Sequence, residues 1–202
     1  MNNKLGLLIS TVFHPVFLNL FGFLILFRVF PSLQGFQFRN QLFLAGFVFF
    51  STALIPMITI LFLKLTGKIN SIQMHTKEER KIPYLITAIG YMFCYYILRE
   101  ARISHLILSY LNACSVIVIL VFIINHYWKI SIHLTSLGSL LAIFLFSTIF
   151  FKNDLRLEIA LVFLVSGFVA STRIFLQSHN FSQVISGYAL GFTIIFIMLL
   201  RF

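Results

Sequence analysis

Residues 130–151 read ISIHLTSLGSLLAIFLFSTIFF and contain no Asp, Glu, Lys or Arg. About 20 consecutive apolar residues are enough for one α-helix to cross the hydrocarbon core of a bilayer. Lys129 and Lys152 flank the run on either side. The segment therefore predicts a membrane-spanning helix.

Charge-free runs of this kind recur along the chain, with shorter examples at 82–98 and 159–172. We predict an all-α fold, a polytopic transmembrane helical bundle with seven spans, or six if the shorter runs do not both cross. The whole of residues 1–202 forms one integral membrane domain in this prediction. The expected spans are about 5–27, 41–63, 82–98, 104–126, 132–151, 157–176 and 181–200.

The composition excludes a water-soluble globule. Hydrophobic residues make up 60% of the chain and charged residues 10%, against about 45–50% and roughly 25% in ordinary soluble domains. The net charge of +10 comes from basic residues scattered between the runs, an arrangement typical of contact with anionic lipid headgroups. We expect membrane lipids as partners and no nucleic acid, and the sequence indicates no particular protein partner.

Alternating crossings place three connections on one membrane face, around residues 64–81, 127–131 and 177–180. A cation, a hydroxyl and imidazoles that meet at one site suit a phosphate group. The polar side chains carried by the three connections are Lys77, Arg80 and Lys81, then Ser131 and His133, then Arg173 and His179.

Arg173 lies near the end of the sixth predicted span. An ionisable residue at membrane depth costs about 2.5–3.5 kcal/mol on insertion scales and usually serves a function, although a long side chain can also reach the headgroups. Arg173 and His179 would be about 120° apart on an unbroken helix. Their convergence therefore requires a turn, for which residues 177–180 supply suitable turn and N-cap side chains.

His179 and Gln183 share one face of the last predicted helix because they are four residues apart. Gly187 and Gly191 continue that face. Small residues at this spacing let a neighbouring helix approach closely. We expect the two glycines to serve helix packing rather than chemistry.

The pattern Thr172-Arg173, five residues, His179, three residues, Gln183-Val184, two residues, Gly187 resembles a known motif. It is similar to the third motif, Ser-Arg-x5-His-x3-Asp-Val-x2-Gly, of the type 2 phosphatidic acid phosphatase superfamily, which includes lipid phosphate phosphatases and vanadium haloperoxidases. The resemblance implies that Arg173 binds phosphate and that His179 attacks phosphorus. Gln183 stands where the family has aspartate, so it can orient the histidine but cannot neutralise its positive charge.

The second family motif, Pro-Ser-Gly-His, is represented by Ile130-Ser131-Ile132-His133. The resemblance implies that Ser131 binds a phosphate oxygen and that His133 acts as the general acid. The first motif, Lys-x6-Arg-Pro, is matched only loosely, by the cations that precede Pro83. These cations, Lys77, Arg80 and Lys81, are either phosphate ligands or part of a solvated interfacial loop.

Taken with the topology, the resemblance implies a metal-independent lipid phosphate phosphatase that needs no cofactor. Its substrate would be a phosphatidate-like phosphomonoester or a polyprenyl diphosphate. The alternative is a degenerate relative that binds phospholipid or scaffolds partners without hydrolysis. A transporter or channel is disfavoured, because we find no inverted repeats and no acidic residues within the charge-free runs.

The remaining metal-ligand side chains form no recognisable metal or disulfide motif. We expect Cys94 and Cys114 to be buried within spans, and the other histidines to pack in the core or at the interface. These histidines are His14, His75, His105 and His126.

The Lys and Arg residues bear on the orientation of the protein. Of the 15, eight fall on the face of the candidate site and seven on the other. If Arg80, Lys81 and Arg173 are set aside as phosphate ligands, five face seven, and the positive-inside rule then places the site on the extracytoplasmic side. We expect the membrane to be a bacterial cytoplasmic membrane.

Overall fold

The structure is a computed structural model that describes residues 3–69 and 76–201. Within these ranges the regular elements are all helices, as predicted. Six helical segments are long and apolar enough to cross a membrane, and they confirm an integral membrane protein. They are Phe38–Leu65, Glu78–Glu100, His105–Tyr127, Ile132–Phe151, Arg156–Phe175 and Phe181–Leu199.

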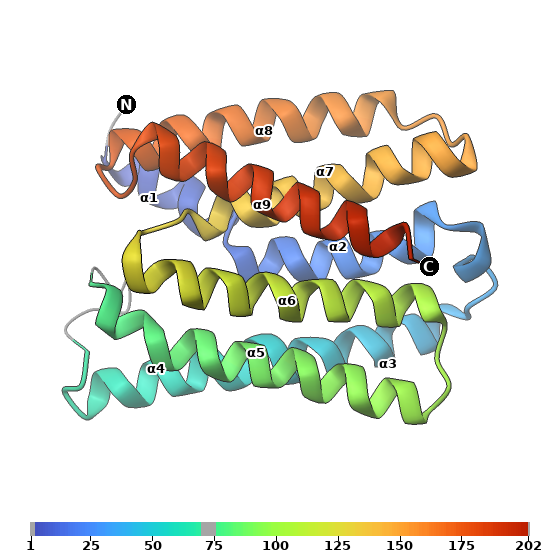
Figure 1. The fold of residues 1–202 in the computed structure, drawn as a ribbon, viewed down its shortest axis with the longest axis horizontal. Coiled ribbons are helices and arrows are strands. Elements are labelled where there is room, and N and C mark those ends of the chain that lie inside the picture. The colour runs from blue at the N-terminus through green and yellow to red at the C-terminus, as the bar shows by residue number, and fades with distance from the viewer. Residues whose placement is uncertain (1–2, 70–75, 202) are drawn as a thin grey trace.

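The first predicted span, 5–27, in which Pro15 predicts a kink, is divided into two separate helices. α1 (Asn3–Val12) and α2 (Pro15–Val29) meet at His14. Proline suits the first position of a helix because its missing N–H has no intrahelical role there, and His14 Nδ1 accepts the Val16 N–H at 3.4 Å. α1 packs against the end of α8, while α2 runs between the two ends of the bundle (Figure 1).

The next segment is nearly continuous after the short 3-10 turn Pro31–Leu33. α3 (Phe38–Phe49) passes through one π-helical stretch, Phe50–Leu54, into α4 (Ile55–Leu65). A π-helical turn shifts the register of side chains around the axis without ending the helix. The predicted span 41–63 lies within this segment.

α5 (Lys77–Glu100) begins five residues before the predicted span at 82–98. Thr76 and Glu79 form a capping box, in which Thr76 Oγ1 accepts the Glu79 N–H at 3.4 Å and Glu79 Oε2 accepts the Thr76 N–H at 3.3 Å. Acidic residues in the first turn further stabilise a helix N-terminus. Arg80 and Lys81 are therefore helical, so residues 77–81 do not form a loop, although Lys81 is exposed as that alternative expected.

The last four helices agree with the predicted spans to within a few residues. They are α6 (His105–Tyr127), α7 (Ile132–Phe151), α8 (Arg156–Phe175) and α9 (Phe181–Leu199). α7 is the most buried of the spanning helices and packs against α2, α8 and α9. It therefore lies at the centre of the part of the bundle that is formed by α2, α7, α8 and α9 (Figure 1).

α7 and α9 cross at very short range through glycines. A Cβ atom on Gly187 would lie 2.5 Å from the Ser131 carbonyl oxygen, and one on Gly191 would clash with the Thr135 carbonyl. Such contact requires the absence of a side chain on α9. The predicted packing role of Gly187 and Gly191 is confirmed.

The end of α4, the start of α5 and the connections α6–α7 and α8–α9 lie toward one end of the bundle, on the left of Figure 1. The connections α2–α3, α5–α6 and α7–α8 lie at the other end. The described parts of the three connections predicted to share a membrane face therefore lie at the same end of the bundle, and α1 lies toward that end as well.

Candidate functional site

The predicted turn between Arg173 and His179 is present. α8 ends in a Schellman motif, in which the Ser178 N–H donates to the Arg173 carbonyl at 3.0 Å and the Gln177 N–H donates to that of Ile174 at 2.9 Å. Gln177 takes the left-handed conformation, with φ at 51°, that reverses the chain in this motif. The His179 N–H then lies 3.3 Å from the Arg173 carbonyl, so His179 returns to the end of α8.

The N-terminus of α9 fixes the orientation of His179. Asn180 caps the helix by accepting the Gln183 N–H at 2.9 Å, and Gln183 Oε1 accepts the Asn180 N–H at 3.2 Å. The same Oε1 lies 3.2 Å from His179 Nδ1. Because an amide oxygen only accepts, Nδ1 of a neutral His179 carries the proton and Nε2 keeps its lone pair.

His179 is a neutral base near pH 7. Its pKa is lowered to about 4, first by burial and then by the positive charges of Arg173, Lys129 and Arg80, while the hydrogen bond with Gln183 opposes the shift. An unprotonated imidazole with a free Nε2 is the state in which histidine acts as a nucleophile.

Arg173 is the centre of a group of cations. The positive charge of Arg173 acts on Lys129, and the positive charge of Arg80 acts on Arg173. Burial, followed by the charges of Arg80 and Arg173, lowers the pKa of Lys129. Arg80 is only 8% exposed and hydrogen-bonds the side chain of Tyr84. Cations held together in partly desolvated surroundings repel each other, so a bound anion would stabilise them.

His133 lies near both Arg173 and His179, whose charges act on it. Its Nε2 is 3.1 Å from the carbonyl oxygen of Ser10 in α1, so Nε2 carries a proton. Arg173 donates from a terminal nitrogen to Ser10 Oγ at 3.4 Å. The ring of His14 meets that of His133 edge to face, with centroids 5.7 Å apart. The α1–α2 elbow therefore contributes two residues to the cluster.

Ser131 ties the start of α7 to the start of α9. Its N–H donates to the Gln183 carbonyl at 3.2 Å, and its side chain is fully buried. In the part of the chain that the structure describes, Ser131 Oγ, His133 Nδ1 and Arg173 Nε are buried without a hydrogen-bond partner. Leaving such an atom unpaired costs about 1–3 kcal/mol. Ser131 Oγ and Arg173 Nε can each donate a hydrogen bond to an anion, whereas Nδ1 of a neutral His133 accepts one.

The predicted site residues do not all join this cluster. Arg80, Ser131, His133, Arg173, His179 and Gln183 do, as the contacts above show. Lys81 is exposed and lines a separate groove of about 200 Å³ with Phe122, His126 and Tyr127. The side chain of Lys77, and the whole of His75, lie outside the described residues.

Four residues were missed as members of the cluster: Ser10, His14, Tyr84 and Lys129. Two of them had a local signal. Lys129 lies two residues before Ser131, and His14 precedes a proline that begins a helix. Ser10 had no such signal, because only the packing of α1 brings it to Arg173.

Among the described residues, no three His, Cys, Asp or Glu side chains are arranged to hold a metal ion. Comparison of the chain with protein families, characterised proteins and solved structures finds no match.

Proposed function

We propose that the protein is a membrane phosphatase that removes a phosphate group from a lipid through a phosphohistidine on His179. The observation that carries this proposal is the buried cluster in which Arg80, Lys129 and Arg173 surround a neutral His179 whose Nε2 lone pair is available. A phosphomonoester carries about −1.5 to −2 charges at neutral pH. The three cations and the unpaired Ser131 hydroxyl complement such a dianion.

In the first step His179 Nε2 attacks phosphorus, a P–N bond forms, and the P–O bond to the lipid breaks. The leaving oxygen takes a proton from Nδ1 of His133, which has no protein partner among the described residues. Since the proton of a neutral His133 lies on Nε2, the proton on Nδ1 is taken up with the substrate, whose negative charge stabilises it. In the second step water attacks phosphorus, the P–N bond breaks, and His133 takes a proton from the water. Phosphate then leaves, and both histidines return to their starting states.

The substrate class follows from the place of the cluster. It lies toward one end of the spanning helices, where the phosphate of a lipid headgroup meets the protein while the tail stays in the bilayer. Phosphatidate-like phosphomonoesters and polyprenyl diphosphates both meet this requirement. We propose a bacterial cytoplasmic membrane and an extracytoplasmic site, in line with the distribution of Lys and Arg.

The test is phosphate release by the purified protein in detergent, with chelator present, from phosphatidate and from undecaprenyl diphosphate. The wild type is compared with His179→Ala and with His126→Ala, a histidine exposed at the end of α6. Release that is lost in His179→Ala and kept in His126→Ala supports the proposal. Release that survives His179→Ala, or no release by the wild type, overturns it.

A second function is favoured by one observation, namely Gln183 in the position of the family's aspartate. An amide can hold the tautomer of His179 but cannot offset the positive charge of a phosphohistidine. In this alternative the cluster binds the phosphate of a lipid without hydrolysis. Phosphatidate that binds to the wild type and to His179→Ala equally, with no release from either, would favour it.

A further inference from the structure

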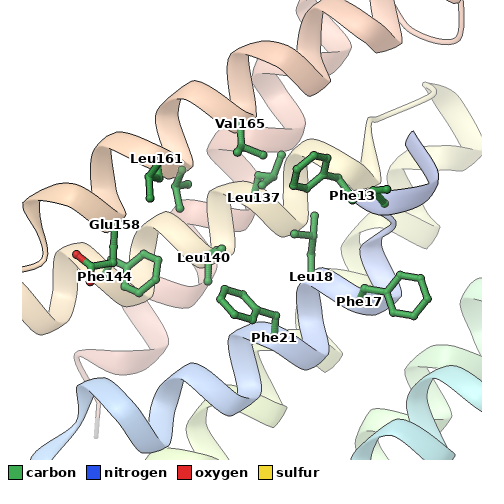
Figure 2. A pocket seen from close by; sticks show the side chains of 12 residues that line it. Phe13, Phe17, Leu18, Phe21, Leu137, Leu140, Phe144, Glu158, Leu161 and Val165 are labelled. Atoms are coloured by element: carbon green, nitrogen blue, oxygen red, sulfur yellow. The ribbon is translucent and has the colours of Figure 1, made fainter. Parts of the chain in front are cut away.

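An apolar groove of about 380 Å³ lies between α2, α7 and α8. Figure 2 shows aromatic and aliphatic side chains of the three helices facing one another across it. Phe13 stands toward one end of the row and Glu158, in the first turn of α8, stands at the other. Other lining residues are Leu18, Leu137, Leu140 and Leu161.

The groove is continuous with the cationic cluster. On α7 the spacing of His133, Leu137, Leu140 and Phe144 keeps all four on one helix face. Leu137 is about 6 Å along the axis from His133, and Phe144 lies about 10 Å further. On the opposite wall Phe13 is the residue before His14, whose ring contacts that of His133. One end of the groove therefore opens beside the candidate phosphate site.

We propose that this groove binds the hydrocarbon chain of the lipid whose phosphate lies in the cluster. This inference rests on the proposed function. At about 30 Å³ for each water-sized group, the groove holds roughly a dozen carbon groups, which corresponds to one chain segment rather than two. The charges also define the direction, because the Glu158 carboxylate at the far end disfavours an anionic headgroup there while the cations attract it.

Two leucines on α8 provide a matched test. Leu161 lines the groove and is 50% exposed, whereas Leu164 is 61% exposed and is not among the lining residues. Tryptophan at Leu161 fills the groove, and tryptophan at Leu164 faces the bilayer. Both positions are exposed enough to accept the larger side chain, and elution from a sizing column in detergent checks the fold of each variant.

With long-chain phosphatidate, Leu161→Trp raises KM about tenfold through the loss of buried chain contacts, and Leu164→Trp leaves it unchanged. With a short-chain phosphatidate neither substitution changes KM. An equal effect of Leu161→Trp on both substrates, or an equal effect of the two substitutions, overturns the inference.

A second measurement needs no turnover and separates this inference from the proposed function. Phosphatidate with a diazirine in its acyl chain is photolysed in the presence of the protein, and the labelled peptides are identified. We expect labelling across 137–144 and 158–165 that Leu161→Trp and Arg173→Ala both reduce. Labelling that neither substitution changes would identify ordinary bilayer lipid as the occupant. Absence of phosphate release with the expected labelling would overturn the hydrolysis alone.

Discussion

Replacing Gln183 by glutamate places one negative charge beside His179 and keeps the length of the side chain. Glutamate also suits this position of the capping box, where it can accept the Asn180 N–H as Gln183 does. The substitution therefore tests the charge that the site lacks. The geometry around the imidazole should change little.

The size of the effect follows from the 3.2 Å contact between Gln183 Oε1 and His179 Nδ1. Two unit charges about 4 Å apart attract by about 4 kcal/mol at an effective dielectric constant near 20. Desolvation of the carboxylate offsets part of this. If only about 1.4 kcal/mol remains in the transition state that forms the phosphohistidine, kcat rises about tenfold.

The same carboxylate changes the pH dependence. In the wild type His179 must be unprotonated to attack, and its pKa is about 4, so kcat/KM falls only as the pH drops toward that value. A carboxylate stabilises the imidazolium and raises the pKa of His179. We expect the acid limb of Gln183→Glu to lie at higher pH, and its kcat above that limb to exceed the wild-type value.

The assay is phosphate release across the pH range, together with a histidine NMR titration that needs no turnover. Gln177→Glu is the matched control, because it adds the same charge at an exposed position in the connection that precedes α9. A wild-type acid limb near pH 6.5 would refute the argument from burial and neighbouring cations. An acid limb and a His179 titration that both stay in place in Gln183→Glu would refute the contact between the two side chains.

Three further predictions concern the cluster and its frame. Ser131→Ala should lower kcat/KM about ten- to a hundredfold, since a hydrogen bond to a charged group contributes about 1.5–3 kcal/mol. The Tm in detergent should stay unchanged or rise, because the buried Ser131 hydroxyl has no partner among the described residues. A lower Tm would show that Ser131 makes a structural hydrogen bond instead. Gly191→Ala should lower Tm, because overpacking against the Thr135 carbonyl costs about 1–3 kcal/mol. Gly167→Ala is the control, since its added methyl group meets open space and should leave Tm unchanged. Equal Tm values for the two variants would contradict the close α7–α9 crossing. Arg173→Lys should raise KM for phosphatidate, because an ammonium group cannot present the planar fork of a guanidinium, and an unchanged KM would argue against direct phosphate binding by Arg173.

The spanning helices were predictable because a bilayer imposes one length requirement on every crossing. Residues 130–151 satisfy that requirement without reference to any other part of the chain. The turn that returns His179 to Arg173 was equally local, since it depends on polar residues within one short connection. Sequence reasoning therefore reached both the membrane fold and this part of the candidate site.

Two local signals in the sequence mark helix boundaries that the predicted spans do not show. Thr76 and Glu79 have the spacing of a capping box, which starts α5 early enough to make Arg80 helical. Pro15 marks the first position of a helix, which divides the first apolar run at His14. Hydrophobicity alone reveals neither boundary, because Thr76 lies among charged residues before an apolar run and His14 lies inside one.

The sequence by itself determined a helical membrane protein with cations and imidazoles on one face. Only the tertiary structure decided that α1 brings Ser10 to His133 and Arg173, across 123 and 163 positions of the chain. The tertiary structure also decided that Arg80 joins the cationic cluster while Lys81 lines a separate groove, although the two residues are adjacent in the sequence. The physical reason is that α7 is apolar on nearly every side, so its sequence does not specify which neighbour meets which face. That choice depends on close contacts between helices, such as the one at Gly191, which form only when the whole bundle packs.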